Sequence, residues 1–196
     1  MILLGPLFCN LYNNNFYYRQ YEKNNAFNEL GEEKTKNITG NLFGFFQDKE
    51  ELNYFNEKEQ SHLIDVKNLF FKLRLVYAMS MFLFLISSFG LYFLYRNNLK
   101  ELKAKISKAF MYSSGFVIFF IILLFLLSRI NFSGFWMLLH KILFTGNYLF
   151  PEDSLLITLF PESFFISFGF LILGISFVVS AVLMLFLVIL LLNRSK

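Results

Sequence analysis

Three long, uncharged stretches of apolar residues constrain the fold of this chain more than any other feature. They cover Leu75 to Tyr95, Ala109 to Ser128 and Ser163 to Asn193. Each reaches the ~20 residues that a helix needs to cross the hydrocarbon core of a bilayer. Only 16% of the residues are charged, whereas soluble domains average about 25%. The sequence therefore predicts an all-α membrane protein with three full transmembrane helices.

The first twelve residues are apolar as well, but they are too few to span a bilayer. They carry no basic flank of the kind that precedes a signal peptide, so we expect a truncated or partial membrane helix. A small extracytoplasmic domain completes the predicted fold. The predicted segments are a partial membrane helix at 1–12, an extracytoplasmic segment at 13–71, membrane helices at 72–95, 109–128 and 163–193, a cytoplasmic loop at 96–108, an extracytoplasmic loop with interfacial helices at 129–162 and a cytoplasmic tail at 194–196.

The basic residues predict the orientation in the membrane. Cytoplasmic loops are enriched in lysine and arginine, and five basic residues lie between the first two spans: Arg96, Lys100, Lys103, Lys105 and Lys108. Arg194 and Lys196 follow the last span. We therefore expect residues 12–74 and 129–163 to lie outside a multi-pass protein of the cell membrane. The net charge of +4 then reflects topology, which excludes a nucleic-acid partner and leaves the lipid bilayer as the expected one.

A capping-box pattern starts the first long helix. Asn56 precedes an acid, Glu59, by three residues, and no helix breaker follows before Tyr95. At about 1.5 Å per residue, a helix over 57–95 is roughly 58 Å long, so we expect its first third to project above the bilayer. Glu59 and His62 share a stripe with apolar residues at helical spacing, which predicts that both point inward.

The sequence leaves the fold of residues 13–56 open. An aromatic cluster of Phe16, Tyr17, Tyr18 and Tyr21 is compatible with a short strand or with a cover at the membrane interface. Gly31, Gly40 and Gly44 are predicted turn positions.

The second outer segment predicts short helices at the membrane interface. We expect Ser133-Gly134 to cap a helix over 135–144, which places Trp136 one turn before His140. A turn at Gly146-Asn147 leads to a second short helix over 155–160, and Pro161-Glu162 opens the last span.

The chain has two histidines, His62 and His140, and the predicted topology places both on the outer side. An imidazole exchanges protons near neutral pH, and a neighbouring carboxylate from Glu59 or Asp65 would fix its tautomer. These histidines are the candidate catalytic residues. We predict no cofactor, and glycine-rich phosphate loops are missing from the sequence. A Gly-x-Ser-x-Gly motif is missing as well, which argues against a serine nucleophile.

Two alternatives stay open. Glu59, His62, Asp65 and His140 offer oxygen and nitrogen ligands for zinc or iron in a membrane hydrolase, although the acid-x-x-His pair is not duplicated and no His-Glu-x-x-His occurs. The second alternative is a non-catalytic membrane scaffold that binds a partner through residues 16–21.

The pattern Glu-x-x-His-Leu-x-Asp-Val-Lys, which runs from Glu59 to Lys67 and precedes a span, resembles the lipoprotein intramolecular transacylases. His140 and the downstream Phe160-Pro161 fit the same likeness. The resemblance implies four membrane helices and an extracytoplasmic domain. It implies transfer of the sn-2 acyl chain of a lipoprotein's diacylglyceryl-cysteine onto its α-amino group. It assigns catalysis to His62 and His140 and supporting positions to Glu59, Asp65, Lys67 and Tyr148, the last standing where a tryptophan is expected.

Overall fold

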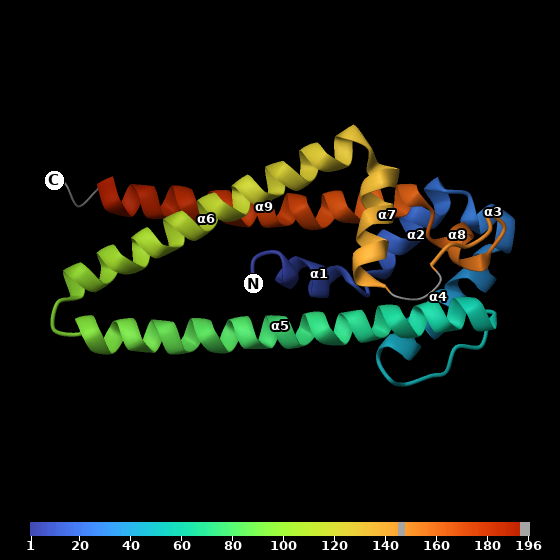
Figure 1. The fold of residues 1–196 in the computed structure, drawn as a ribbon, viewed down its shortest axis with the longest axis horizontal. Coiled ribbons are helices and arrows are strands. Elements are labelled where there is room, and N and C mark those ends of the chain that lie inside the picture. The colour runs from blue at the N-terminus through green and yellow to red at the C-terminus, as the bar shows by residue number, and fades with distance from the viewer. Residues whose placement is uncertain (145–147, 193–196) are drawn as a thin grey trace. The chain divides into compact units, whose positions relative to one another are not determined.

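The computed structural model describes residues 1–144 and 148–192. The helices, coloured along the chain in Figure 1, are α1 (Leu4–Asn10), α2 (Asn14–Lys23), α3 (Ala26–Leu30), α4 (Glu32–Phe46), α5 (Glu57–Tyr95), α6 (Leu99–Ile130), α7 (Phe132–Leu143), α8 (Leu155–Leu159) and α9 (Glu162–Leu192). No strand occurs among the described residues, so the predicted all-α class is confirmed. The predicted turn at Gly146-Asn147 and the predicted tail at 194–196 lie outside the described residues.

Three of the described helices, α5, α6 and α9, are long and apolar enough to cross a membrane. Their apolar side chains mostly face outward, and in the most apolar stretch of α5 0% of the residues are buried. Leu94, for example, is 78% exposed. A helix satisfies its own backbone hydrogen bonds, so such a surface is stable in lipid and would be costly in water.

The chain divides into two compact units, which we describe separately. The first contains residues 1–6, 73–130 and the described residues from 171 onward. Small polar residues on its long helices are buried, namely Ser107 and Ser114 of α6 and Ser176 and Ser180 of α9. The Ser176 hydroxyl donates to the carbonyl of Ile172 at 2.8 Å. Small residues allow close approach of helices within a membrane.

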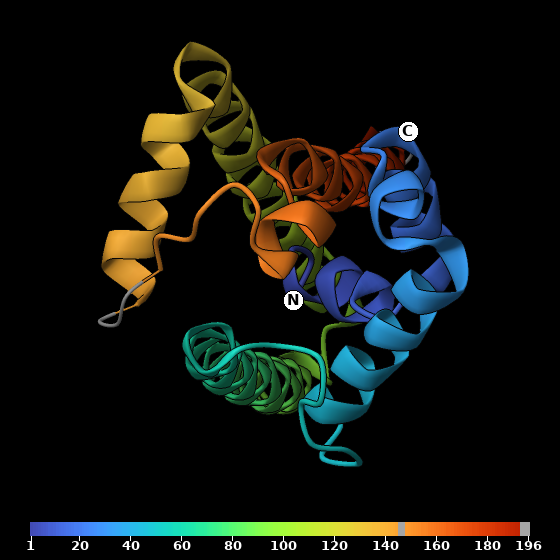
Figure 2. The same ribbon diagram turned by 90° about the vertical axis from the view of Figure 1, so that its right-hand side faces the viewer.

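The second unit contains residues 7–72 and 131–170. Its short helices gather around the N-terminal ends of α5 and α9, as Figures 1 and 2 show. The predicted aromatic cluster lies on a helix, α2, which begins where the Asn13 side chain accepts from the amide of Phe16 at 3.3 Å. Tyr17 packs edge-on against Phe43 of α4 at 4.9 Å and Phe164 of α9 at 5.2 Å. These aromatic contacts form the core of this unit.

Of the three turns predicted at glycines, two are wrong. Gly31 does form a turn between α3 and α4, with φ of +87°, a value that glycine adopts without strain. Gly40 and Gly44 lie within α4. That helix buries Ile38 and Leu42, and burial of two such side chains outweighs the roughly 1 kcal/mol that each helical glycine costs.

Two other boundaries differ from the prediction. The segment 96–108 is not a loop, because α6 begins at Leu99. The Asn98 side chain accepts from the amide of Glu101 at 3.1 Å and so caps this helix. Helix α7 begins at Phe132, three residues early, because the Asn131 side chain accepts from the amide of Gly134 at 2.9 Å. In both places an asparagine supplies the cap.

Candidate active site

The predicted capping box at the start of α5 is confirmed. The amide of Glu59 donates to the Asn56 side chain at 3.0 Å, and the amide of Asn56 donates to Glu59 Oε2 at 3.0 Å. The other carboxylate oxygen, Oε1, accepts from the amide of Leu156 in α8 at 3.1 Å. Glu59 is 1% exposed. Its carboxylate therefore joins the start of α5 to α8, and both of its oxygens are bonded to backbone amides.

His62 lies one turn further along α5 in an aromatic surrounding. Its ring centroid is 5.0 Å from that of Phe144 and 5.4 Å from that of Phe150. The pKa of His62 is lowered from its usual 6.5 to about 4, mainly by partial burial and to a smaller extent by the nearby His140, against the opposing charge of Asp65. At neutral pH this imidazole is therefore uncharged.

His140 lies on α7 beside His62. The two imidazole centroids are 6.1 Å apart, and the ring planes are inclined by 18°. Nδ1 of His140 lies 3.0 Å from the carbonyl oxygen of Trp136. A carbonyl only accepts, so Nδ1 carries the hydrogen, and the uncharged ring keeps its free lone pair on Nε2. The structure thus brings the two candidate histidines together and fixes the tautomer of one.

Aromatic contacts and one polar contact hold α7 in place. The ring of Trp136 is 4.5 Å from that of His140 and 4.2 Å from that of Phe165 in α9. At the start of α7, the Ser133 hydroxyl lies 2.8 Å and 3.0 Å from the two carboxylate oxygens of Glu162. Helix α7 is thereby anchored to the start of α9.

The segment around Phe150 is tied to α5 by a lysine that sequence reasoning missed. Lys58 Nζ donates to the carbonyl of Leu149 at 2.6 Å and lies 5.1 Å from the ring centroid of Phe150. The two partners are 91 residues apart in the chain, and no local sequence pattern indicates such a contact. On the same segment, the ring of Tyr148 is 5.3 Å from that of His140.

Lys67 supports the site from a distance. Its Nζ donates to the carbonyl of Phe45 at 2.6 Å and lies 2.6 Å from a carboxylate oxygen of Asp48. Phe45 belongs to the last turn of α4, where unpaired carbonyls and the helix dipole favour a cation. Lys67 therefore fixes α5 against the end of α4.

The alternative metal set is not assembled. Within residues 1–144 and 148–192, no group of three or more His, Cys, Asp and Glu side chains could hold a metal ion. Glu59 is turned toward the amides of Asn56 and Leu156, which separates it in function from the two imidazoles.

Long apolar helices, together with two stacked imidazoles that an α-helical domain holds, define an all-helical membrane protein with a candidate acid–base site. Residues 1–165 match the family model described as lipoprotein intramolecular transacylase Lit. The chain belongs to this family, and it is an integral membrane enzyme of the acyltransferase class. This membership replaces the scaffold and metal-hydrolase alternatives.

The solved structures agree in fold. The membrane-integral lipoprotein intramolecular transacylase Lit of Bacillus cereus is 22% identical, with a TM-score of 0.80 over 100% of this chain and 91% of that chain. Two variants of that protein, with a histidine replaced by alanine or by arginine, both give a TM-score of 0.77 at 22% identity over 99% of this chain, and cover 88% and 87% of theirs. A comparison with curated proteins gives no match.

Proposed function

We propose that His62 and His140 are the catalytic pair of an intramolecular acyl transfer on a lipoprotein at the outer face of the cell membrane. The substrate is a diacylglyceryl-cysteine with a free α-amino group. The product carries the sn-2 acyl chain on that nitrogen and a free hydroxyl on the glycerol. The observation that carries the proposal is the stacked imidazole pair, with centroids 6.1 Å apart.

His140 has the tautomer that a general base needs. Its Nδ1–H donates to the carbonyl of Trp136. The lone pair is therefore on Nε2, where it can take a proton. The α-amino nitrogen attacks the sn-2 ester carbonyl and forms a carbon–nitrogen bond, and its proton passes to His140 Nε2. An α-amino pKa of about 7.7–8.0 leaves a useful fraction of this amine uncharged near neutral pH.

His62 complements this base as an uncharged hydrogen-bond donor. A ring whose pKa is near 4 stays neutral at pH 7, and a neutral imidazole N–H can stabilise the oxyanion that develops on the ester carbonyl. The tetrahedral intermediate then collapses. The bond from carbon to the sn-2 oxygen breaks, and the proton on His140 passes to that oxygen, so the step requires no external acid or water.

The separation of the rings suits one substrate. With their centroids 6.1 Å apart, both imidazoles can reach atoms bonded to the same tetrahedral carbon through hydrogen bonds of about 2.6–3.2 Å. Amine and ester belong to the same molecule, so positioning supplies much of the rate. In this scheme Asp65 tunes His62, while Glu59, Lys67 and Tyr148 support the geometry.

The test uses the full chain reconstituted in vesicles with a synthetic diacylated lipopeptide, and mass spectrometry of the product. We expect an N-acylated lyso-lipopeptide from the wild type and a loss of about 10²–10⁴-fold in rate in His62→Gln and His140→Gln. Lys141→Gln, an exposed neighbour of His140, is the matched control and should retain the rate. Absence of the lyso product in the wild type, or undiminished rates in both histidine variants, would overturn the proposal.

A further inference from the structure

A pocket adjoins Phe150, one of the rings that contact His62. It has a volume of about 480 Å³, within the ~300–1,000 Å³ typical of ligand sites. Lys58 and Glu59, four and three residues before His62 on α5, form one wall. The other wall includes Phe150, Pro151, Asp153, Ser154 and Leu155. Phe150 lines the pocket and also contacts the ring of His62 at 5.4 Å.

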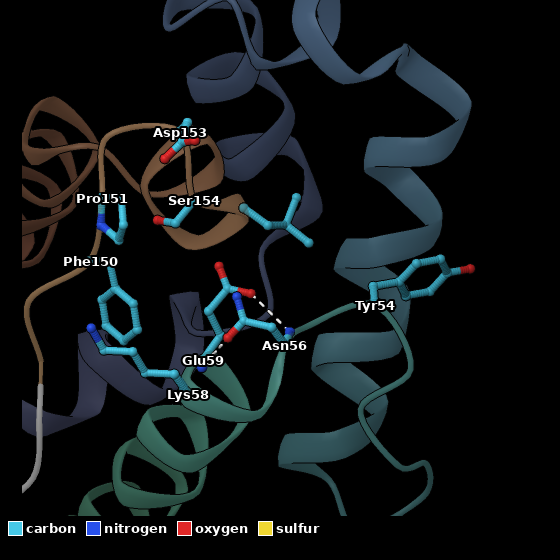
Figure 3. A pocket seen from close by; sticks show the side chains of 9 residues that line it. Tyr54, Asn56, Lys58, Glu59, Phe150, Pro151, Asp153 and Ser154 are labelled. Carbon is cyan, nitrogen blue, oxygen red and sulfur yellow. Dashed lines mark hydrogen bonds between the residues drawn. The ribbon is translucent and has the colours of Figure 1, made fainter.

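The lining of this pocket combines polar and apolar groups. Most of its lining residues are polar, namely Asn56, Lys58, Glu59, Asp153 and Ser154. Figure 3 shows the Asp153 and Ser154 side chains near the start of α8 and the Lys58 side chain running along Phe150. Lys58 and Asp153 are exposed, and they offer a charged donor and a charged acceptor.

On the α7 side, the surroundings of the histidine pair are aromatic. His140 is flanked on α7 by Trp136 and Phe144. The surroundings of the two imidazoles therefore change from aromatic rings at α7 to a lining with charged side chains at the start of α5.

We propose that this pocket binds the peptide chain that follows the acylated cysteine of the substrate. The inference rests on the function proposed above. Two parts of the lipidated cysteine extend from the reacting nitrogen. The side-chain sulfur leads to the acyl chains, and the main-chain carbonyl leads to the peptide. The aromatic side suits the acyl chains, and the pocket suits the peptide. In the pocket, Lys58 can donate to main-chain carbonyl groups and Asp153 can accept from main-chain amides.

Two synthetic substrates test the pocket by activity. One is the diacylglyceryl-cysteine amide, and the other carries four uncharged residues after the cysteine. We expect kcat/KM of the reconstituted full chain to be about tenfold higher for the longer substrate, the effect of one or two hydrogen bonds. Asp153→Asn should reduce this gain at least threefold, whereas Glu152→Gln, a neighbouring exposed carboxylate outside the pocket, should retain it. Equal kcat/KM for both substrates in the wild type would overturn the pocket and leave the proposed function intact.

A second measurement does not depend on turnover. The longer lipopeptide carries a photoreactive benzophenone side chain at its third residue, and mass spectrometry locates the cross-link. We expect adducts within residues 54–59 and 150–155. Adducts there without any acyl transfer would support the pocket and overturn the proposed function. Adducts elsewhere, or none, would overturn the pocket whatever the rate.

Discussion

The two candidate catalytic imidazoles differ in what surrounds them. His140 has one nitrogen bonded to a backbone carbonyl, which fixes its tautomer. His62 is surrounded by the rings of Phe144, Phe150 and His140, so removal from water dominates its behaviour. An acyl transfer needs both a base and a neutral hydrogen-bond donor. The different environments of His140 and His62 thus support the different roles proposed for them.

The environment of His62 gives a titration prediction. In the chain with ¹⁵N-labelled histidine, we expect NMR to report a pKa of about 4 for His62. Because Asp65 favours the charged imidazolium, Asp65→Asn should lower this pKa further. His140→Gln should raise it, since one source of repulsion disappears. Glu152→Gln serves as the control and should leave it unchanged.

The sign of the shift sets its link to stability. A depressed folded-state pKa means that the unfolded chain binds more protons between pH 4 and 6.5. In that window His62 therefore contributes stability that is lost as pH falls. A His62 resonance that titrates near 6.5 would contradict the burial seen here and the neutral-donor role that depends on it.

The sequence could predict that the two histidines lie on the same side, but not how they are held. Both histidines follow from their count and from the charge bias of the loops. Asp65 was predicted as a neighbour of His62 because helical spacing places it nearby. The contact of Lys58 with Leu149, 91 residues away, and the bond of His140 to Trp136 depend on tertiary packing and rotamers, which no local pattern specifies.

At the scale of elements, Glu59 connects two helix starts with one buried carboxylate. It completes the capping box of α5 and accepts from the amide of Leu156 in α8. Glu59→Ala would leave both amides without this partner in a buried place. We expect a loss of about 2 kcal/mol in unfolding free energy, seen as a fall of roughly 5 °C in melting temperature. Glu57→Ala in the same turn, where the side chain is exposed, should shift it by much less. Equal shifts for both would show that the link to α8 contributes little.

Lys67 joins α5 to the end of α4 in a more solvated place. Its side chain is 26% exposed and that of Asp48 is 78% exposed, so screening by water reduces the value of the ion pair. The bond to the Phe45 carbonyl at 2.6 Å is the stronger part. We expect Lys67→Met to lower the unfolding free energy by about 1 kcal/mol, measured by thermal unfolding in detergent. The control is Lys72→Met, an exposed lysine on the same helix, and a larger loss there would contradict this assignment.

The long helices and the short helices α7 and α8 were predictable, whereas α2 and α3 were not, for a physical reason. Helix α5 runs from Glu57 to Tyr95 as predicted, because a capping box starts it and a continuous apolar run sustains it. Helices α2 and α3 contain 10 and 5 residues, lengths at which isolated helices are marginal. Contacts such as that of Tyr17 with Phe164 decide their structure, and those contacts come from distant parts of the chain.

At the scale of the whole molecule, an apolar membrane part is combined with a domain that holds the candidate catalytic residues. The three membrane helices expose apolar side chains, as a lipid solvent allows. Both histidines and the polar pocket belong to the other unit. The substrate proposed for this enzyme is itself amphiphilic, with acyl chains in the bilayer and a peptide in water. The protein, with its apolar helices and its more polar second unit, thus matches the amphiphilic character of the proposed substrate.

The predicted orientation determines which side of the membrane meets the substrate, and the single cysteine makes it testable. In a Cys9→Ala background, Lys34→Cys and Lys103→Cys each place one thiol at an exposed position, on α4 and α6 respectively. Lysine-rich loops favour the cytoplasm, so a membrane-impermeant maleimide applied to intact cells should label the first variant. The second should react only after the membrane is dissolved, which also shows that its thiol is reactive. The reverse pattern would place both histidines at the cytoplasmic face, where the proposed reaction on a lipoprotein at the outer face could not occur.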